Sequence, residues 1–248
     1  MTDQTPTTHF GFSTVPVAEK ASLVRGVFDR VAPRYDLMND LMSLGVHRIW
    51  KSILLDTLRP RPTMTLLDVG GGTGDIAFGF RKRGGGPTLV VDINQEMLKV
   101  GRDRALDTGQ IEDLTWVTGD AQSLPVKSRS VDAYTIAFCL RNVTNIDDAL
   151  AEAYRVLKPG GRFLCLEFSH VTVPGLSQIY DTYSFQVLPT LGQLVAKDRE
   201  AYQYLVESIR RFPPQAELAQ RIETVGFQNV SVRNLSGGIA AIHSGWRL

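Results

Sequence analysis

Short apolar runs alternate with segments of helical spacing between residues 63 and 171. The runs are TLLDV, TLVVD, LTWVTGD, VDAYTIAF and GRFLCLE, and their length and β-branched residues are typical of buried strands. Between them, apolar residues recur every three or four positions, for example at Met97, Leu98, Gly101 and Ala105. Strands that alternate with helices predict right-handed crossovers and a mostly parallel sheet with helices on both faces. The chain therefore has the pattern of an α/β protein.

Helical patterns flank this central region, and two strand-like runs close the chain. The spacing of apolar residues predicts helices over Val17–Val31 and Trp50–Leu58, each ending ahead of a proline. After Gln215, one more helix pattern precedes QNVSVRNLS and GIAAIHSGW, which we expect to pair as an antiparallel hairpin around Gly237. Residues 1–15 are polar and show no period, so they are expected to form a flexible tail.

Charge and hydropathy exclude several classes of partner. Lys and Arg number 27 against 26 Asp and Glu, a net charge of +1, whereas proteins that bind nucleic acid by bulk attraction are strongly basic. No apolar run approaches the roughly 18 residues of a membrane-spanning helix, and the N-terminus lacks the features of a targeting segment. We therefore expect a cytosolic protein without nucleic acid, whose Cys139 and Cys165 are reduced and buried. The histidines are scattered along the chain, so no metal centre is expected.

A glycine-rich turn, LLDVGGGTGD, lies between the first strand of this region and the helix that follows. Glycines there let the backbone approach a ligand closely. The dinucleotide fingerprint needs a third glycine where Asp75 stands, and a carboxylate at that place would repel a pyrophosphate. Gly70, Gly72 and Gly74, with Thr73 between them, instead resemble the G-x-G-x-G loop of class I methyltransferases that use S-adenosylmethionine (SAM). An acidic lining from Asp68 and Asp75 suits a ligand that carries a sulfonium and an ammonium group.

Aspartates also close the next two strands. Asp92 stands 24 residues after Asp68, where a carboxylate can accept both ribose hydroxyls in NAD proteins and methyltransferases alike. Asp120 resembles the methyltransferase position that accepts from the adenine amino group, with the Ala121 N–H reaching the ring. A single aspartate at a strand end is often only a turn or a helix cap. Three of them behind this glycine loop favour a SAM site.

Two longer stretches resemble one family. YDLMNDLMSLGVHRIW, from Tyr35 to Trp50, and RVLKPGGRFLCLEFS, from Arg155 to Ser169, are similar to the paired motifs of the ubiquinone/menaquinone biosynthesis C-methyltransferases. LKPGG is common among class I methyltransferases, whereas the Tyr35–Trp50 stretch is specific, and the likeness covers nearly everything after the tail. The resemblance implies a Rossmann-like class I fold with a seven-stranded sheet. It also implies methyl transfer from SAM to a ring carbon of a methoxy polyprenyl benzoquinol, of demethylmenaquinol, or of both.

The implied reaction needs a ring carbon made nucleophilic by loss of a proton from the neighbouring hydroxyl. Arg141 and Asn142 follow the fourth strand, where open α/β sheets place their substrate crevice. We expect Arg141 to stabilise the phenolate and orient a water, with Asn142 beside it. Tyr35 is carried over from the family as a hydrogen-bonding partner.

Each of these assignments has a plainer alternative. Arg141 could pair with Asp147 or Asp148, and Tyr35 and Tyr183 could merely pack. His47 is more often a satisfied helix histidine than a base, and Glu167, which ends the fifth strand, has equal structural and functional readings. Ala137 stands where some relatives have a serine, so any hydrogen bond from that hydroxyl is missing here.

The stretch from Thr172 to Ala196 is almost uncharged. It contains one charged residue, Asp181, whereas a chain that is 21% charged would place about five in such a length. It could be a buried helix and loop, or a surface that meets the prenyl tail or a membrane. The protein is expected to have a polyprenyl quinol as its substrate and to touch the inner face of the membrane, as a homodimer or in a quinone-biosynthesis assembly.

We therefore expect one methyltransferase domain, 1–248, with five parts. These are a flexible tail (1–15), a helical lid (16–62), a SAM-binding core (63–171), a substrate lid insertion (172–214) and a closing helix with its hairpin (215–248). Two other functions stay open at this stage: a class I methyltransferase for another small phenol or acid, and a non-catalytic SAM-binding assembly subunit.

Overall fold

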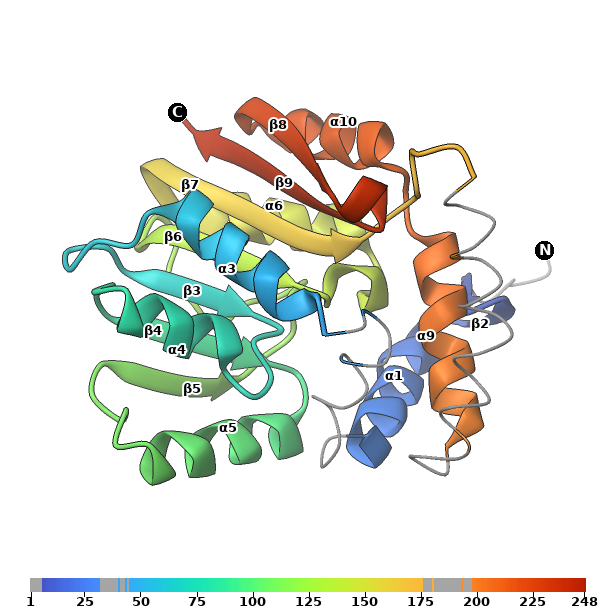
Figure 1. The fold of residues 1–248 in the computed structure, drawn as a ribbon, viewed down its shortest axis with the longest axis horizontal. Coiled ribbons are helices and arrows are strands. Elements are labelled where there is room, and N and C mark those ends of the chain that lie inside the picture. The colour runs from blue at the N-terminus through green and yellow to red at the C-terminus, as the bar shows by residue number, and fades with distance from the viewer. Residues whose placement is uncertain are drawn as a thin grey trace.

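A seven-stranded mixed sheet forms the centre of the computed structural model, which describes residues 6–31, 40, 43, 45–175, 180, 193 and 198–248 (Figure 1). The strands are β3 (Leu66–Val69), β4 (Thr88–Asp92), β5 (Leu114–Thr118), β6 (Val131–Ala137), β7 (Leu157–Phe168), β8 (Gln228–Leu235) and β9 (Ala240–Arg247). Their order is β5-β4-β3-β6-β7-β9-β8. The first five in this order are parallel, and β9 runs antiparallel to both of its neighbours, β7 and β8. The Rossmann-like fold and the closing hairpin expected from the sequence are confirmed.

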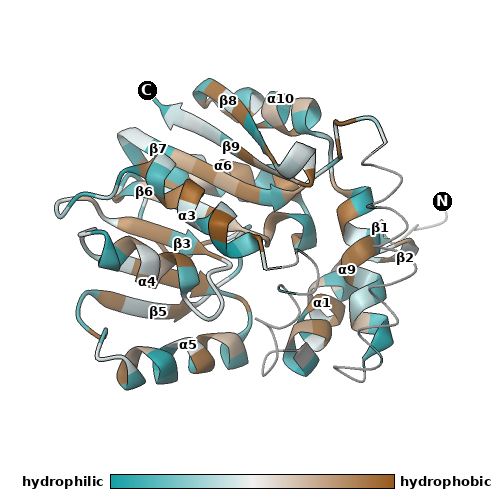
Figure 2. Cartoon of the chain, in the orientation of Figure 1, coloured by the Kyte–Doolittle hydropathy of each residue, from teal (hydrophilic) through white to brown (hydrophobic). Residues whose placement is uncertain are grey.

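Helices cover both faces of the sheet. On one face lie α3 (His47–Leu58), α4 (Asp75–Lys82) and α5 (Gln95–Asp107), and on the other α6 (Ile146–Val156) and α10 (Gln215–Val225). Neighbouring strand residues such as Leu66 and Leu67 enter opposite cores, as the two-residue period of a strand requires. In Figure 2 the helices alternate between hydrophobic and hydrophilic residues, as expected of elements with one buried face.

The strand order places two loops together at one edge of the sheet. From β3 the chain runs outward to β4 and β5 and then returns to β6 on the other side of β3. Parallel strands on either side of such a switch point leave a crevice at their carboxyl ends. The glycine turn after β3 and the short helix η2 (Leu140–Asn142) after β6 therefore border the same crevice.

The N-terminal part packs beyond that edge, and here the expected flexible tail of residues 1–15 is wrong for the residues described. Thr7–Phe10 (β1) and Ser13–Pro16 (β2) form an antiparallel hairpin with Gly11 at φ +57° in its turn. It leads into α1 (Val17–Val31), which lies beside α9 (Arg199–Arg211) in Figure 1. The hairpin is held by α9, because Phe10 stacks on Tyr204. Because the contact joins segments that are far apart in the sequence, no local periodicity predicts the hairpin.

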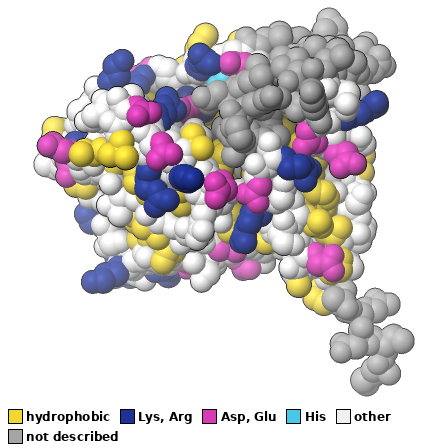
Figure 3. Space-filling view, turned by 90° about the horizontal axis from the view of Figure 1, so that it is seen from below, with side chains coloured by type: hydrophobic (Ala, Val, Ile, Leu, Met, Phe, Trp, Pro, Cys, Tyr) yellow, Lys and Arg dark blue, Asp and Glu magenta, His cyan; other side chains and the backbone are white. Residues whose placement is uncertain are grey.

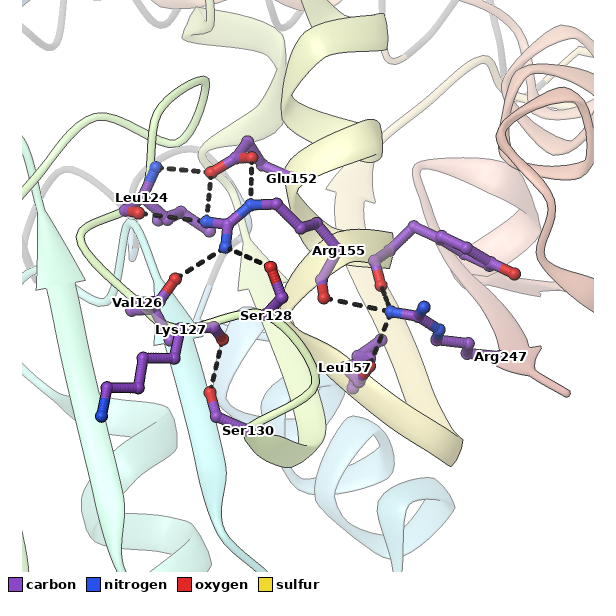
Figure 4. Close-up of polar contacts among 10 residues, drawn as sticks. Leu124, Val126, Lys127, Ser128, Ser130, Glu152, Arg155, Leu157 and Arg247 are labelled. Atoms are coloured by element: carbon purple, nitrogen blue, oxygen red, sulfur yellow. Dashed lines mark hydrogen bonds and ion pairs between the residues drawn. The ribbon is translucent and has the colours of Figure 1, made fainter.

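The C-terminal strand is tied to the end of α6. The Arg247 guanidinium donates to the carbonyl oxygens of Tyr154 and Arg155, which the helix end leaves without intrahelical partners, and to that of Leu157, the first residue of β7 (Figure 4). On the face shown in Figure 3, basic and acidic side chains are interspersed, in keeping with the net charge of +1. Among the described residues, no helix has both the length and the apolar character needed to cross a membrane.

Candidate functional site

A pocket lies at the switch point between β3 and β6. It contains about 1060 Å³ of space, part of which is open to solvent. Its walls come from α1, from the glycine turn, from the ends of β4 and β6 and from the loop after β5. Of the predicted cofactor residues, the pocket is lined by Asp68, Gly70, Gly72, Thr73, Asp92, Asp120 and Ala121. Gly74 is the residue before α4 and completes the turn.

The glycine turn has a backbone that only glycine adopts easily. Gly70, Gly72 and Gly74 have φ values of +63°, +52° and +86°. A Cβ on Gly70 would collide with the Cys139 side chain, and one on Gly74 would lie 2.6 Å from the Trp116 ring. Gly71, which the sequence pattern did not single out, also has no room for a side chain, because its Cβ would lie 2.7 Å from Asp68 Oδ2. Without side chains at these positions, the floor of the pocket is formed by the backbone of the turn.

Asp68 is buried beneath this turn, with 1% of its surface exposed. Its Oδ1 accepts a hydrogen bond of 2.7 Å from the Thr135 hydroxyl, whereas Oδ2 has no hydrogen-bond partner among the described residues. Burial raises the pKa of Asp68 to about 7. A buried carboxylate oxygen without a partner is costly, so this position suits a ligand that brings a positive charge or an N–H group.

Asp92 and the glycine turn are hydrogen-bonded to each other. The Gly72 N–H donates to Asp92 Oδ2 at 2.9 Å, and the Asn94 N–H donates to Oδ1 at 2.9 Å. Burial is the main cause of the rise in the pKa of Asp92 to about 6. Both oxygens keep a lone pair beyond these bonds, so the carboxylate at the end of β4 can still accept from ribose hydroxyls.

Asp120 and Ala121 follow β5 in a loop that α6 holds in place. Asp120 Oδ1 accepts from the Gln122 N–H at 2.9 Å, which closes a tight turn. Beyond it, the Leu124 N–H donates to Glu152 Oε2 at 2.7 Å, and Arg155 donates to the carbonyl oxygens of Leu124 and Val126 (Figure 4). This network anchors the loop that carries both residues to the pocket wall.

Asp75 corrects one expectation about charge. It lines the pocket, but Lys51 and Arg104 pair with it at 2.6 and 2.5 Å. Those two cations hold the pKa of Asp75 down at about 2, against the effect of burial. Its negative charge is therefore compensated, and the acidic lining for a cationic ligand comes from Asp68 and Asp92 instead.

Arg141 and Asn142 lie side by side in η2 but face different spaces. Asn142 lines the pocket, whereas Arg141 lines a neighbouring crevice that shares Val143 and Thr144 with it. Arg141 Nη1 donates to Glu167 Oε1 at 2.7 Å, in an ion pair whose side chains are 2% and 1% exposed. The alternative pairing of Arg141 with Asp147 or Asp148 is wrong.

Of the other predicted residues, Tyr35 and Tyr183 lie outside the described residues. His47 is buried and shares a hydrogen bond of 3.0 Å with Ser43, and burial lowers its pKa to about 4, so it is the satisfied helix histidine. Cys165 is buried, whereas Cys139 is only partly buried and borders the pocket, as does Ala137.

Sequence reasoning missed the wall that α1 contributes. Ala21, Val24, Arg25 and Phe28 line the pocket, and Val24 also belongs to the main core. Their helical spacing predicted a buried face but not what that face covers. Taken together, the glycine floor, the unpartnered oxygen of Asp68 and the carboxylate of Asp92 fit SAM, which presents an ammonium group, a sulfonium and two ribose hydroxyls.

Comparisons with known proteins identify the family of the chain. The model of the ubiE/COQ5 methyltransferase family matches residues 16–247. The ubiquinone/menaquinone biosynthesis C-methyltransferase UbiE of Paracoccus denitrificans is 59% identical over 247 residues, which cover 99% of each chain. The protein of the same name from Cereibacter sphaeroides (strain ATCC 17029) is 58% identical over 251 residues, covering 100% of each.

Solved structures share the fold at much lower identity. A SAM-dependent methyltransferase of Thermotoga maritima has a TM-score of 0.66 at 18% identity, covering 91% of this chain and 100% of its own. The [4+2]-cyclase SpnF has a TM-score of 0.68 at 16% identity, covering 92% and 96%. Because one of these two proteins is a cyclase, the fold alone does not establish the reaction.

Proposed function

Because the chain belongs to the ubiE/COQ5 methyltransferase family, we propose that it methylates a ring carbon of a polyprenyl quinol in ubiquinone and menaquinone biosynthesis. The chain is a SAM-dependent C-methyltransferase. The observation that carries the proposal is one pocket in which Asp68, Asp92, Asp120 and the glycine turn meet Asn142. The cofactor residues and Asn142, the residue proposed to contact the quinol, therefore line the same pocket.

Within this proposal the cofactor residues bind and orient. Bound SAM supplies a methyl group that its sulfonium makes electrophilic. Asp68 neutralises the ammonium group, Asp92 accepts from the ribose hydroxyls, and Asp120 with the Ala121 N–H holds the adenine. The glycine turn admits the cofactor without steric conflict, so the direction in which the methyl group points is set by the protein.

The other side of the pocket prepares the quinol. Loss of the hydroxyl proton leaves negative charge on the quinol oxygen, and that charge needs stabilisation where water is excluded. Asn142 borders the pocket and donates to this oxygen. Arg141 lies on the same turn, and the field of its ion pair with Glu167 is proposed to help stabilise this charge from the neighbouring crevice. Tyr35 is proposed as a further hydrogen-bonding partner.

We expect the purified protein to transfer a methyl group from SAM to demethylmenaquinol or to a methoxy polyprenyl benzoquinol, with the methylated quinol measured by mass spectrometry. The Asp92→Ala variant should lose the activity, which guards against a contaminating host enzyme. Asp107→Ala, at an exposed aspartate that ends α5, should keep it.

Other outcomes of this assay separate the alternatives. Methylation of a short phenol or acid but of neither quinol would identify a different substrate class. SAM binding without any turnover, together with quinone synthesis restored in a deletion strain by an Arg141→Ala variant, would identify a non-catalytic assembly subunit.

A further inference from the structure

The turn that carries Arg141 and Asn142 is held by three separate elements. Glu167 of β7 pairs with Arg141, and the Tyr204 hydroxyl of α9 donates to Asn142 Oδ1 at 3.0 Å. Lys20 of α1 donates from Nζ to the Val143 carbonyl at 3.0 Å. The three holding side chains come from residues that are 1%, 5% and 1% exposed. Such a short turn with three buried anchors is organised before any ligand arrives.

The bond from Tyr204 decides which end of the Asn142 carboxamide faces which partner. Burial raises the pKa of Tyr204, so its hydroxyl keeps its proton and acts as a donor. A carboxamide that accepts at Oδ1 has its amide nitrogen left to donate, and the described residues offer that nitrogen no acceptor. Asn142 borders the cofactor pocket, so the donor end is available to an electron-rich oxygen there.

Tyr204 is in turn held by the N-terminal hairpin. The ring of Phe10 stacks on the ring of Tyr204, with centroids 4.2 Å apart and planes 20° from parallel. The hairpin is also fixed to α9 by the Phe12 N–H, which donates to Glu207 Oε2 at 2.9 Å. Phe10 lies before residue 16, where the match to the family model begins. The segment that the sequence presented as a tail thus reaches the site through one aromatic ring.

We propose that Tyr204 is a positioning residue that turns the Asn142 amide nitrogen toward the quinol oxygen, and that Phe10 holds the Tyr204 ring for this task. The inference rests on the proposed function, which gives Asn142 its donor role. Without the hydroxyl, the carboxamide can rotate by half a turn and present its own oxygen to the negative quinol oxygen. Repulsion between the two oxygens then replaces a hydrogen bond during methyl transfer.

The test is a double-mutant cycle on the full chain, with SAM and demethylmenaquinol as substrates and radiolabelled methyl transfer as a sensitive readout. Tyr204→Phe keeps the ring stack and should lower kcat about tenfold, with the KM for SAM unchanged within about twofold. In an Asn142→Ala background the same substitution should cause no further loss, because Tyr204 acts only through Asn142. Phe10→Ala should lower kcat by a smaller factor and add nothing to Tyr204→Phe.

Tyr134→Phe is the matched control, since Tyr134 is 1% exposed and lies in the core on the α6 side of the sheet. It should leave kcat unchanged. Equal losses from Tyr204→Phe with and without Asn142, or an unchanged kcat, would overturn the inference. If Asn142→Ala has no measurable turnover, the cycle between Phe10 and Tyr204 decides, and additive losses there count against the relay. A wild-type protein without quinol methylation would instead contradict the proposed function.

Discussion

Asp68 carries a buried carboxyl that the proposed function pairs with the ammonium group of SAM. Its pKa is about 7 in the unliganded protein against 3.8 in an unfolded chain, so the folded state binds more protons between these values. Stability therefore falls as the pH rises through this window, and the loss is complete above the folded pKa. The same carboxyl must be ionised to attract the ammonium group of SAM. The buried carboxyl of Asp68 thus lowers the stability of the fold at neutral pH, while its charge favours the binding of SAM.

Replacing Asp68 with Asn should reveal this trade. The amide keeps an acceptor for Thr135 but cannot ionise, so the unliganded variant should have a higher Tm than the wild type at about pH 8 and no advantage at about pH 4. The affinity of the wild type for SAM should increase as the pH rises through about 7, whereas the affinity of the variant should be weak both below and above this pH. Differential scanning calorimetry and isothermal titration calorimetry measure the two effects.

The exposed Asp103 of α5 provides the control, because Asp103→Asn should change neither quantity. A wild-type SAM affinity that does not vary with pH, or an Asp68→Asn variant that binds as tightly as the wild type, would show that Asp68 does not hold the ammonium group.

At the scale of elements, the buried Arg141–Glu167 pair joins η2 to the end of β7. Removing one partner of a buried pair leaves the other charge without compensation, whereas replacing both with apolar residues often restores stability. The pair therefore allows the structural and the functional contributions of Arg141 to be separated.

We expect Arg141→Met to lower the free energy of unfolding by roughly 3–5 kcal/mol and the double variant Arg141→Met/Glu167→Leu to recover most of it. Methyl transfer should stay low in both, because neither variant restores the Arg141 guanidinium. Urea unfolding and the methylation assay measure the two quantities.

Arg221→Met, which breaks exposed pairs with Glu217 and Asp147, should cost no more than about 1 kcal/mol and should leave activity unchanged. Activity in the stable double variant would contradict the proposed role of Arg141, and a double variant as unstable as the single one would contradict the structural account.

For the molecule as a whole, a near-neutral surface is combined with an almost uncharged stretch, Thr172–Ala196, most of which lies outside the described residues. We propose that this stretch meets the prenyl tail or the membrane surface. Replacing Leu188 and Leu191 with Glu should reduce co-sedimentation with phospholipid vesicles, because charges resist transfer into an apolar layer.

Val100→Glu on α5, at another exposed apolar position, is the control and should leave co-sedimentation unchanged. Vesicle association that persists in the Leu188/Leu191 variant would move the membrane contact to another part of the chain.

Local patterns were enough to predict the sheet, its covering helices and the glycine turn. A strand repeats every two residues, a helix about every 3.6, and a glycine at positive φ is a property of its own position, so each signal lies within a few neighbouring residues. Asp68, Asp92 and Asp120 could be found for the same reason, since each lies at or near the end of a strand that the pattern locates.

Only the tertiary structure decided which charges and rings meet. Lys51 and Arg104 form ion pairs with Asp75, and Glu167 forms one with Arg141. Tyr204 donates a hydrogen bond to Asn142, and Phe10 of the N-terminal hairpin stacks on Tyr204. These contacts join residues 24 to 194 positions apart, and no periodicity connects positions at such separations. Their partners are set by strand order and helix packing, which bring distant segments to one edge of the sheet.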